Sequence, residues 1–129
     1  MQMTRLMQVL LGLAVLALAG GPALAQEGDP AAGEKVFNKC KACHVLDEQK
    51  NRVGPYLLGI IGRPAGTAEG FKYSPAMQES GIVWDEETIA EYVADPRAYV
   101  PGNRMAFPGL KKEEDIANLV AYLKEATQP

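Results

Sequence analysis

Residues Cys40-Lys41-Ala42-Cys43-His44 form the pattern C-x-x-C-H, which is the attachment signature of c-type haem. Two cysteines three apart on a helix face the same way, so both thiols can add to the two vinyl groups of one haem. The adjacent histidine then reaches the iron as a fixed axial ligand. The pattern therefore predicts one covalent haem, bound through Cys40 and Cys43 with His44 on the metal.

The C-x-x-C part of the pattern also occurs in thioredoxin-like redox proteins and in zinc sites. A thioredoxin motif needs a βαβ context, and the sequence shows no strand pattern that would supply one. Structural zinc needs four ligands, whereas the chain holds only two cysteines and one histidine. A Cys40–Cys43 disulfide stays open as an alternative, although it leaves His44 without a role.

The second axial ligand must come from another residue type, because His44 is the only histidine. The methionines beyond the motif are Met77 and Met105. Met77 lies in an expected short helix, where we expect it to pack in the core. Met105 lies in the loop 101–107, from which its sulfur can approach the iron on the face opposite His44. Such His/Met ligation leaves no open position for a substrate.

Length and composition indicate one ordinary globular domain. The chain has 129 residues, of which 47% are hydrophobic and 22% charged. Its net charge is −3 and its pI about 5.2, which argues against nucleic acid as a partner.

The first 25 residues have the layout of a secretory signal peptide. Arg5 precedes the apolar run Val9–Ala19, and the small-residue motif Ala23-Leu24-Ala25 follows. The alternative is a membrane anchor, but a spanning helix needs roughly 20 apolar residues. We expect cleavage after Ala25, a mature domain over 26–129, and a periplasmic location.

Capping and periodicity predict an all-α protein with about four to five helices and long loops. The first helix begins at Asp29-Pro30, and apolar residues at helical spacing continue through both cysteines. Five glycines and two prolines within 54–70 exclude a helix or central strand there. A short helix is expected to begin at Ser74-Pro75 and to stop at Gly81.

Two further helices complete the expected set. One is capped by Asp85, has Trp84 and Ile89 placed as a hydrophobic staple, and ends at Pro96. The last opens on the acidic residues 113–115, which suit the positive end of a helix. Its apolar face consists of Ile116, Leu119, Val120 and Leu123.

These features resemble class I c-type cytochromes, the family of mitochondrial cytochrome c and the small bacterial c2-type carriers, over about residues 28–127. The resemblance implies the cytochrome c fold wrapped around one haem, with Gly33 and Phe37 packed against Leu119 and Tyr122. It also implies that the Pro55 carbonyl accepts a hydrogen bond from His44.

Further site residues follow from the same resemblance. It places Arg63, Tyr73 and Trp84 around the haem propionates, and Phe107 beside the exposed haem edge. Tyr92 resembles the residue that donates a hydrogen bond to the sulfur of the axial methionine, here Met105. Asn103, at a position where many relatives carry threonine, is expected to contact a propionate.

The family relationship implies a soluble, monomeric one-electron shuttle rather than an enzyme. Such carriers connect a cytochrome bc complex with a terminal oxidase, a reductase or a photosynthetic reaction centre. One alternative is a membrane-anchored relay with an uncleaved N-terminus. Another is a small haem peroxidase or gas sensor, which would need an open position on the iron.

The resemblance also implies a basic docking surface around the haem edge, despite the acidic net charge. Six residues match positions that are basic in family members: Lys39, Arg52, Arg97, Arg104, Lys111 and Lys112. Acidic residues concentrate elsewhere, at 47–48, 85–87 and 113–115. Separated charges of this kind orient a protein toward an acidic partner and speed the encounter.

Overall fold

The computed structural model describes residues 27–129, and the whole of the expected signal peptide, residues 1–25, lies outside them. The described part contains five helices: α1 (Pro30–Phe37), α2 (Pro75–Gln78), α3 (Glu86–Ala94), α4 (Pro96–Tyr99) and α5 (Glu113–Ala126). Its β-structure is limited to an isolated bridge between Pro64 and Val83. The all-α prediction is confirmed. Within 27–129, no helix combines the length and apolar character needed to cross a bilayer.

Three helices begin with the same pair, a capping side chain followed by proline. The side chains of Asp29, Ser74 and Asp95 accept hydrogen bonds from backbone N–H groups at the starts of α1, α2 and α4. Proline suits the next position because its missing N–H would have no partner there. The starts of α1 and α2 confirm the prediction. Helix α4 was not predicted, because Pro96 ends the expected preceding helix and also begins a new one.

The start of α3 contains a reciprocal cap. The Asp85 carboxylate accepts from the Thr88 backbone N–H at 2.8 Å, and the Thr88 hydroxyl accepts from the Asp85 N–H at 2.9 Å. Trp84 and Ile89, on either side of this cap, are both buried. The predicted cap and staple are confirmed, and together they fix where Trp84 enters the core.

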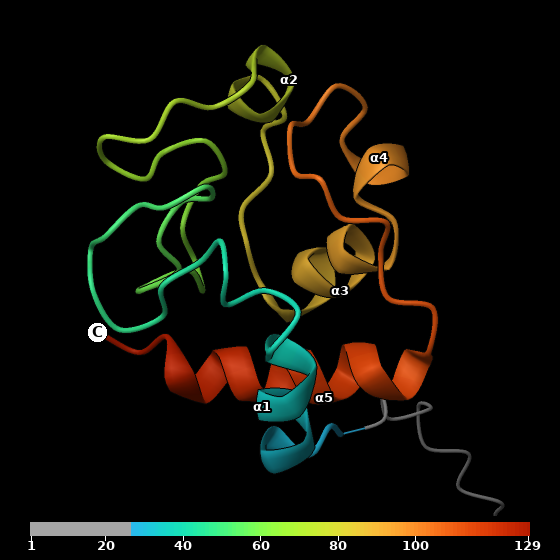
Figure 1. The fold of residues 1–129 in the computed structure, drawn as a ribbon. Coiled ribbons are helices and arrows are strands. Elements are labelled where there is room, and N and C mark those ends of the chain that lie inside the picture. The colour runs from blue at the N-terminus through green and yellow to red at the C-terminus, as the bar shows by residue number, and fades with distance from the viewer. Residues whose placement is uncertain (1–26) are drawn as a thin grey trace, which may run out of the picture.

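Helix α1 crosses α5 closely, as Figure 1 shows at the foot of the molecule. A Cβ atom at Gly33 would overlap the carbonyl oxygen of Asn118 and would lie 2.7 Å from Cβ of Tyr122. The Phe37 and Tyr122 rings pack with their centroids 5.7 Å apart. The buried Asn118 side chain accepts a hydrogen bond of 2.8 Å from the backbone N–H of Asp29. The expected packing of the first helix on the last is therefore present.

Replacing Gly33 with alanine should lower the free energy of unfolding of the haem-loaded protein by about 3 kcal/mol, because the added methyl group must push the two backbones apart. Urea unfolding measures this change. Glu34→Ala, an exposed change on the same helix, should stay within about 0.5 kcal/mol of the wild type. Equal effects of the two substitutions would show that the crossing has room for a side chain.

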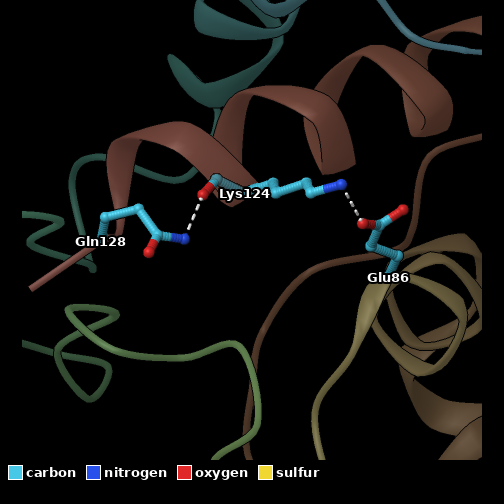
Figure 2. Close-up of polar contacts among 3 residues, drawn as sticks. All are labelled: Glu86, Lys124 and Gln128. Carbon is cyan, nitrogen blue, oxygen red and sulfur yellow. Dashed lines mark hydrogen bonds and ion pairs between the residues drawn. The ribbon is translucent and has the colours of Figure 1, made fainter.

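The far end of α5 is tied to its neighbours by polar contacts. Lys124 forms an ion pair of 2.7 Å with Glu86 at the start of α3, and the Gln128 side chain donates to the Lys124 carbonyl (Figure 2). Both charged side chains are more than half exposed, so this pair adds little stability. The buried Thr127 contributes more directly, because its carbonyl accepts a 2.7 Å bond from the Gly59 N–H and anchors the glycine-rich loop.

The glycine-rich loop 54–70 contains no helix, as predicted, and backbone hydrogen bonds hold it to the segment before α3. Gly62 N–H donates to the Trp84 carbonyl at 2.6 Å, and Trp84 N–H donates to the Arg63 carbonyl at 2.9 Å. A further bond of 2.8 Å joins Ala65 to Ile82. This ladder sets Arg63 and Trp84 beside each other at one end of the core.

Candidate functional site

A cavity of about 490 Å³ lies between α1, α3, α5 and the loops around them. Most of its wall is apolar, and its size is within the range of small-molecule and cofactor sites. The wall includes all eleven residues singled out from the sequence: Cys40, Cys43, His44, Pro55, Arg63, Tyr73, Trp84, Tyr92, Asn103, Met105 and Phe107. Residues that sequence analysis did not assign also line it, among them Val53, Ile60, Phe71 and Lys72.

A second hollow of about 630 Å³ is larger but more open, and it shares only Phe37 and His44 with the cavity. The rest of its lining carries opposite charges, including Asp47 and Arg52. It contains neither cysteine. The less open cavity, which holds both cysteines, is therefore the candidate site.

The two cysteines lie in turns rather than on a helix, which corrects the sequence prediction. Helix α1 ends at Phe37, and the chain continues through turns to Cys43. The Phe37 carbonyl accepts bonds from the N–H groups of both Cys40 and Lys41, and the Cys40 carbonyl accepts from those of Cys43 and His44. Bonds that span three residues therefore alternate with bonds that span four, so parts of the segment are wound more tightly than an α-helix. Apolar periodicity continues past Phe37 and cannot reveal this change. Both cysteines and the adjacent His44 still line one cavity.

The cysteine alternatives gain no support from the structure. Both cysteines are free, so the 40–43 disulfide is absent. Within 27–129, no group of three or more His, Cys, Asp or Glu side chains could hold a metal ion. Burial raises the pKa of Cys40, which is opposite to the lowered pKa of a reactive thioredoxin-type thiol.

His44 is held in one orientation. Its Nδ1 lies 2.7 Å from the Pro55 carbonyl oxygen, which can only accept, so Nδ1 carries the proton. Burial lowers the pKa of His44 despite this bond, which keeps the ring neutral at pH 7. A Cβ at Gly54 would overlap the imidazole ring, so only glycine allows the backbone this close. The bond implied by the resemblance is present, and Nε2 is left free to bind a metal.

Tyr92 is placed to donate to the sulfur of Met105. Its hydroxyl oxygen lies 3.9 Å from Sδ, within reach of a hydrogen bond to sulfur. Burial raises the pKa of Tyr92 to about 12, so the hydroxyl keeps its proton at neutral pH. Its ring packs on Trp84 with centroids 5.1 Å apart, which fixes the direction of the hydroxyl.

Met77 also lines the cavity, but its surroundings differ from those of Met105. It is 8% exposed and belongs to the main hydrophobic cluster, as expected for a core residue. Its backbone is fixed in α2 by the Ser74 cap. Met105 is half-buried, lies outside any helix, and has a hydroxyl directed at its sulfur. These differences favour Met105 over Met77 as a metal ligand.

A positive charge is fixed at one end of the cavity. The Arg63 guanidinium donates to the carbonyls of Tyr56 at 2.9 Å and Leu58 at 3.3 Å, and it lies 5.1 Å from the centre of the Tyr56 ring. Burial lowers the pKa of Arg63, but arginine remains charged at neutral pH. The nearby Tyr73 hydroxyl accepts a bond from the Ala68 N–H. This end of the cavity therefore suits an anionic group of a ligand.

The proposed basic surface is only partly assembled at the cavity. Lys39 and Arg104 line it, and Lys72 joins them, although sequence analysis had not selected it. Arg52 lies at the second hollow instead. Arg97, Lys111 and Lys112 are exposed but do not line either space.

The donor set of the cavity fits a covalently attached haem. The two thiols and the imidazole come from segment 40–44, and the thioether sulfur of Met105 comes from segment 101–107. The apolar wall would cover the macrocycle, and the fixed guanidinium matches its carboxylates. A haem with histidine and methionine ligands uses this combination of groups.

A family model, similar sequences and a solved structure all relate this chain to the same family. The family described as cytochrome c matches residues 30–127. Cytochrome c2 of Blastochloris viridis is 48% identical over 119 residues, which cover 92% of each chain. Cytochrome c-554 of Methylosinus trichosporium is 54% identical over 84% of this chain and 83% of its own. The solved structure of cytochrome cH from Methylobacterium extorquens matches with a TM-score of 0.71 and 46% identity, over 75% of this chain and 98% of that one.

Proposed function

This chain belongs to the cytochrome c family, and on that premise we propose that it is a one-electron carrier with haem c attached through Cys40 and Cys43. His44 and Met105 are the proposed axial ligands. The haem, when bound, supplies an iron that alternates between Fe(II) and Fe(III). Membership of the family confirms the resemblance inferred from the sequence.

The observation that carries this proposal is the convergence of both thiols, the oriented imidazole and the Met105 sulfur on one apolar cavity. Pro55 holds the proton on Nδ1 of His44, so the same nitrogen always faces the cavity. Tyr92 directs its hydroxyl at the sulfur from the other segment. Ligands fixed in both oxidation states keep the structural change on electron transfer small.

Fixed ligands on both faces also distinguish a carrier from an enzyme. A peroxidase or gas sensor needs an iron position that a small molecule can take. In this chain the loop 101–107 brings a sulfur to the cavity, and the contact with Tyr92 holds it there. We therefore propose electron transfer without substrate binding, and not catalysis.

Location and partners form part of the same proposal. The leader-like segment supports export and cleavage after Ala25. We propose that the mature protein is a monomer that carries electrons in the periplasm between a cytochrome bc complex and an oxidase, reductase or reaction centre. Mass spectrometry of the purified protein distinguishes the free carrier from an anchored relay. A chain that starts at Gln26 is expected; retention of residues 1–25 would support the anchor.

Docking is proposed to occur where the cavity meets the surface. Lys39, Lys72 and Arg104 line the cavity together with Phe107. Val53, also in the lining, is 79% exposed, which is unusual for a large apolar side chain. Positive charges around an apolar centre suit a partner whose docking site is acidic with an apolar middle.

Electron transfer to such an acidic partner tests the proposal by stopped-flow kinetics. The second-order rate should fall as ionic strength rises, because salt at 0.1 M already screens charges beyond about 10 Å. Arg104→Gln and Lys72→Gln should each slow the reaction severalfold at low salt. The matched control Lys124→Gln removes a charge outside the cavity wall and should have little effect. A rate that rises with salt, or equal effects at all three positions, would contradict the docking surface.

A further inference from the structure

The side chain of Asn103 is fully engaged within its own loop. Its Nδ2 donates to the carbonyls of Pro96 at 2.8 Å and Val100 at 2.9 Å. Its Oδ1 accepts from the backbone N–H of Met105 at 2.9 Å and lies 3.5 Å from the Tyr92 hydroxyl. One primary amide therefore joins the first residue of α4 and the residue that follows α4 to the backbone of Met105, the proposed ligand.

An asparagine amide has two N–H donors and one oxygen with two lone pairs. Both donors are used on carbonyls, and the oxygen faces two N–H or O–H donors. No capacity remains for a carboxylate of a ligand. The expected propionate contact of Asn103 is therefore not supported by this arrangement.

We infer that Asn103 is a positioning residue, which holds the Met105 backbone in the arrangement that presents the sulfur to the cavity. The Tyr92 hydroxyl has a single proton, for which the Asn103 oxygen and the Met105 sulfur are alternative acceptors. The inference rests on the proposed function for the identity of the ligand. Other bonds of the loop are the backbone turns from Asn103 to Val100 and from Phe107 to Met105, and a 3.5 Å bond from Arg104 to the Tyr73 carbonyl. Pro101 has no N–H to donate. Among residues 27–129, the side-chain oxygen of Asn103 accepts the hydrogen bond from the Met105 N–H.

The hydrogen bonds of Asn103 predict a different loss for each replacement of this side chain. Aspartate has the same shape and could still accept from Met105, but it would turn two carbonyl oxygens toward a carboxylate. Threonine offers a single donor. Alanine removes all the side-chain bonds. Each substitution therefore removes a different set of hydrogen bonds from the loop. An experiment can distinguish the three variants by this difference.

The test uses oxidised and reduced holoprotein of the wild type, Asn103→Ala, Asn103→Asp and Asn103→Thr. Imidazole added to the oxidised protein competes with the Met105 sulfur, and optical titration gives its affinity. We expect Asn103→Ala to raise this affinity about tenfold or more, since it removes several hydrogen bonds that favour the closed loop. Amide exchange in the reduced protein should show loss of Met105 protection in Asn103→Ala and its partial retention in Asn103→Asp.

Asn51 provides a matched control in another loop. Its Nδ2 donates to the Glu69 carbonyl at 2.9 Å, and its Oδ1 accepts from the Tyr56 N–H at 3.1 Å. Asn51→Ala should lower stability to urea but leave imidazole affinity within about twofold of the wild type.

The outcomes distinguish this inference from the function on which it rests. The positioning role would be overturned if Asn103→Ala kept the wild-type affinity for imidazole and the wild-type exchange rate of the Met105 amide. If the alanine variant does not fold, the same result in Asn103→Thr would overturn it. A wild type that lacks the near-infrared sulfur-to-iron band would instead refute Met105 as ligand. Loss of Met105 amide protection in the Asn103 variants would still support the positioning of the loop in that case.

Discussion

Replacing both Cys40 and Cys43 with alanine should abolish covalent haem attachment, the largest effect expected of any change in this chain. Thioether bonds need thiols, and the sequence contains no third cysteine. Acid-acetone extraction of the wild type should leave the haem on the polypeptide, and mass spectrometry should show the added mass of one haem. The double variant should yield only the mass of the apoprotein.

Two controls make this result specific. Each single cysteine variant keeps one thiol and can retain at most one thioether bond. Ser80→Ala changes a half-buried hydroxyl outside the cavity wall and should keep full attachment. Haem that stays on the double variant after extraction, or that leaves the wild type, would contradict the assignment of Cys40 and Cys43.

Replacing Met105 with alanine should convert a closed haem into one that binds external ligands. The oxidised wild type is expected to show the near-infrared band of sulfur-to-iron ligation, and the variant should lose it. The reduced variant should bind carbon monoxide, because removal of the thioether leaves an open position. Tyr92 would also lose the acceptor at which its hydroxyl is directed.

Met77→Leu is the matched control, because it removes the other cavity methionine while conserving volume. The band should persist and carbon monoxide should not bind. Leucine should also keep the packing of α2, since such swaps usually cost under about 1.5 kcal/mol. Loss of the band in Met77→Leu and its survival in Met105→Ala would reverse the ligand assignment.

Local sequence signals predicted most of the fold. Helix starts could be located because a capping side chain and a following proline act within a few residues of each other, as at Asp29-Pro30 and Ser74-Pro75. The same signal exists at Asp95-Pro96, so α4 could have been found. The turns from 38 to 43 could not, because apolar spacing does not distinguish an α-helix from consecutive tighter turns.

Some groups of the candidate site could be predicted from the sequence motif alone, and others only from the family resemblance. The cysteine motif identifies its own chemistry, since all its groups lie within five residues. Tyr92 and Met105 meet only through the packing of α3 against the loop before α5, which spacing cannot give. Their pairing came from the family resemblance. The bonds of Asn103 to Pro96 and Val100 depend on the missed helix α4, so its positioning role was not foreseen.

We propose that this cytochrome carries single electrons on a haem whose axial positions are both held by the chain. A spectroscopic redox titration of the intact purified protein, run once under argon and once under carbon monoxide, tests it most directly. We predict one reversible one-electron transition with the same midpoint under both gases. Carbon monoxide that bound an open reduced iron would stabilise that form and raise the midpoint potential. A higher midpoint under carbon monoxide, with an altered reduced spectrum, would contradict the account.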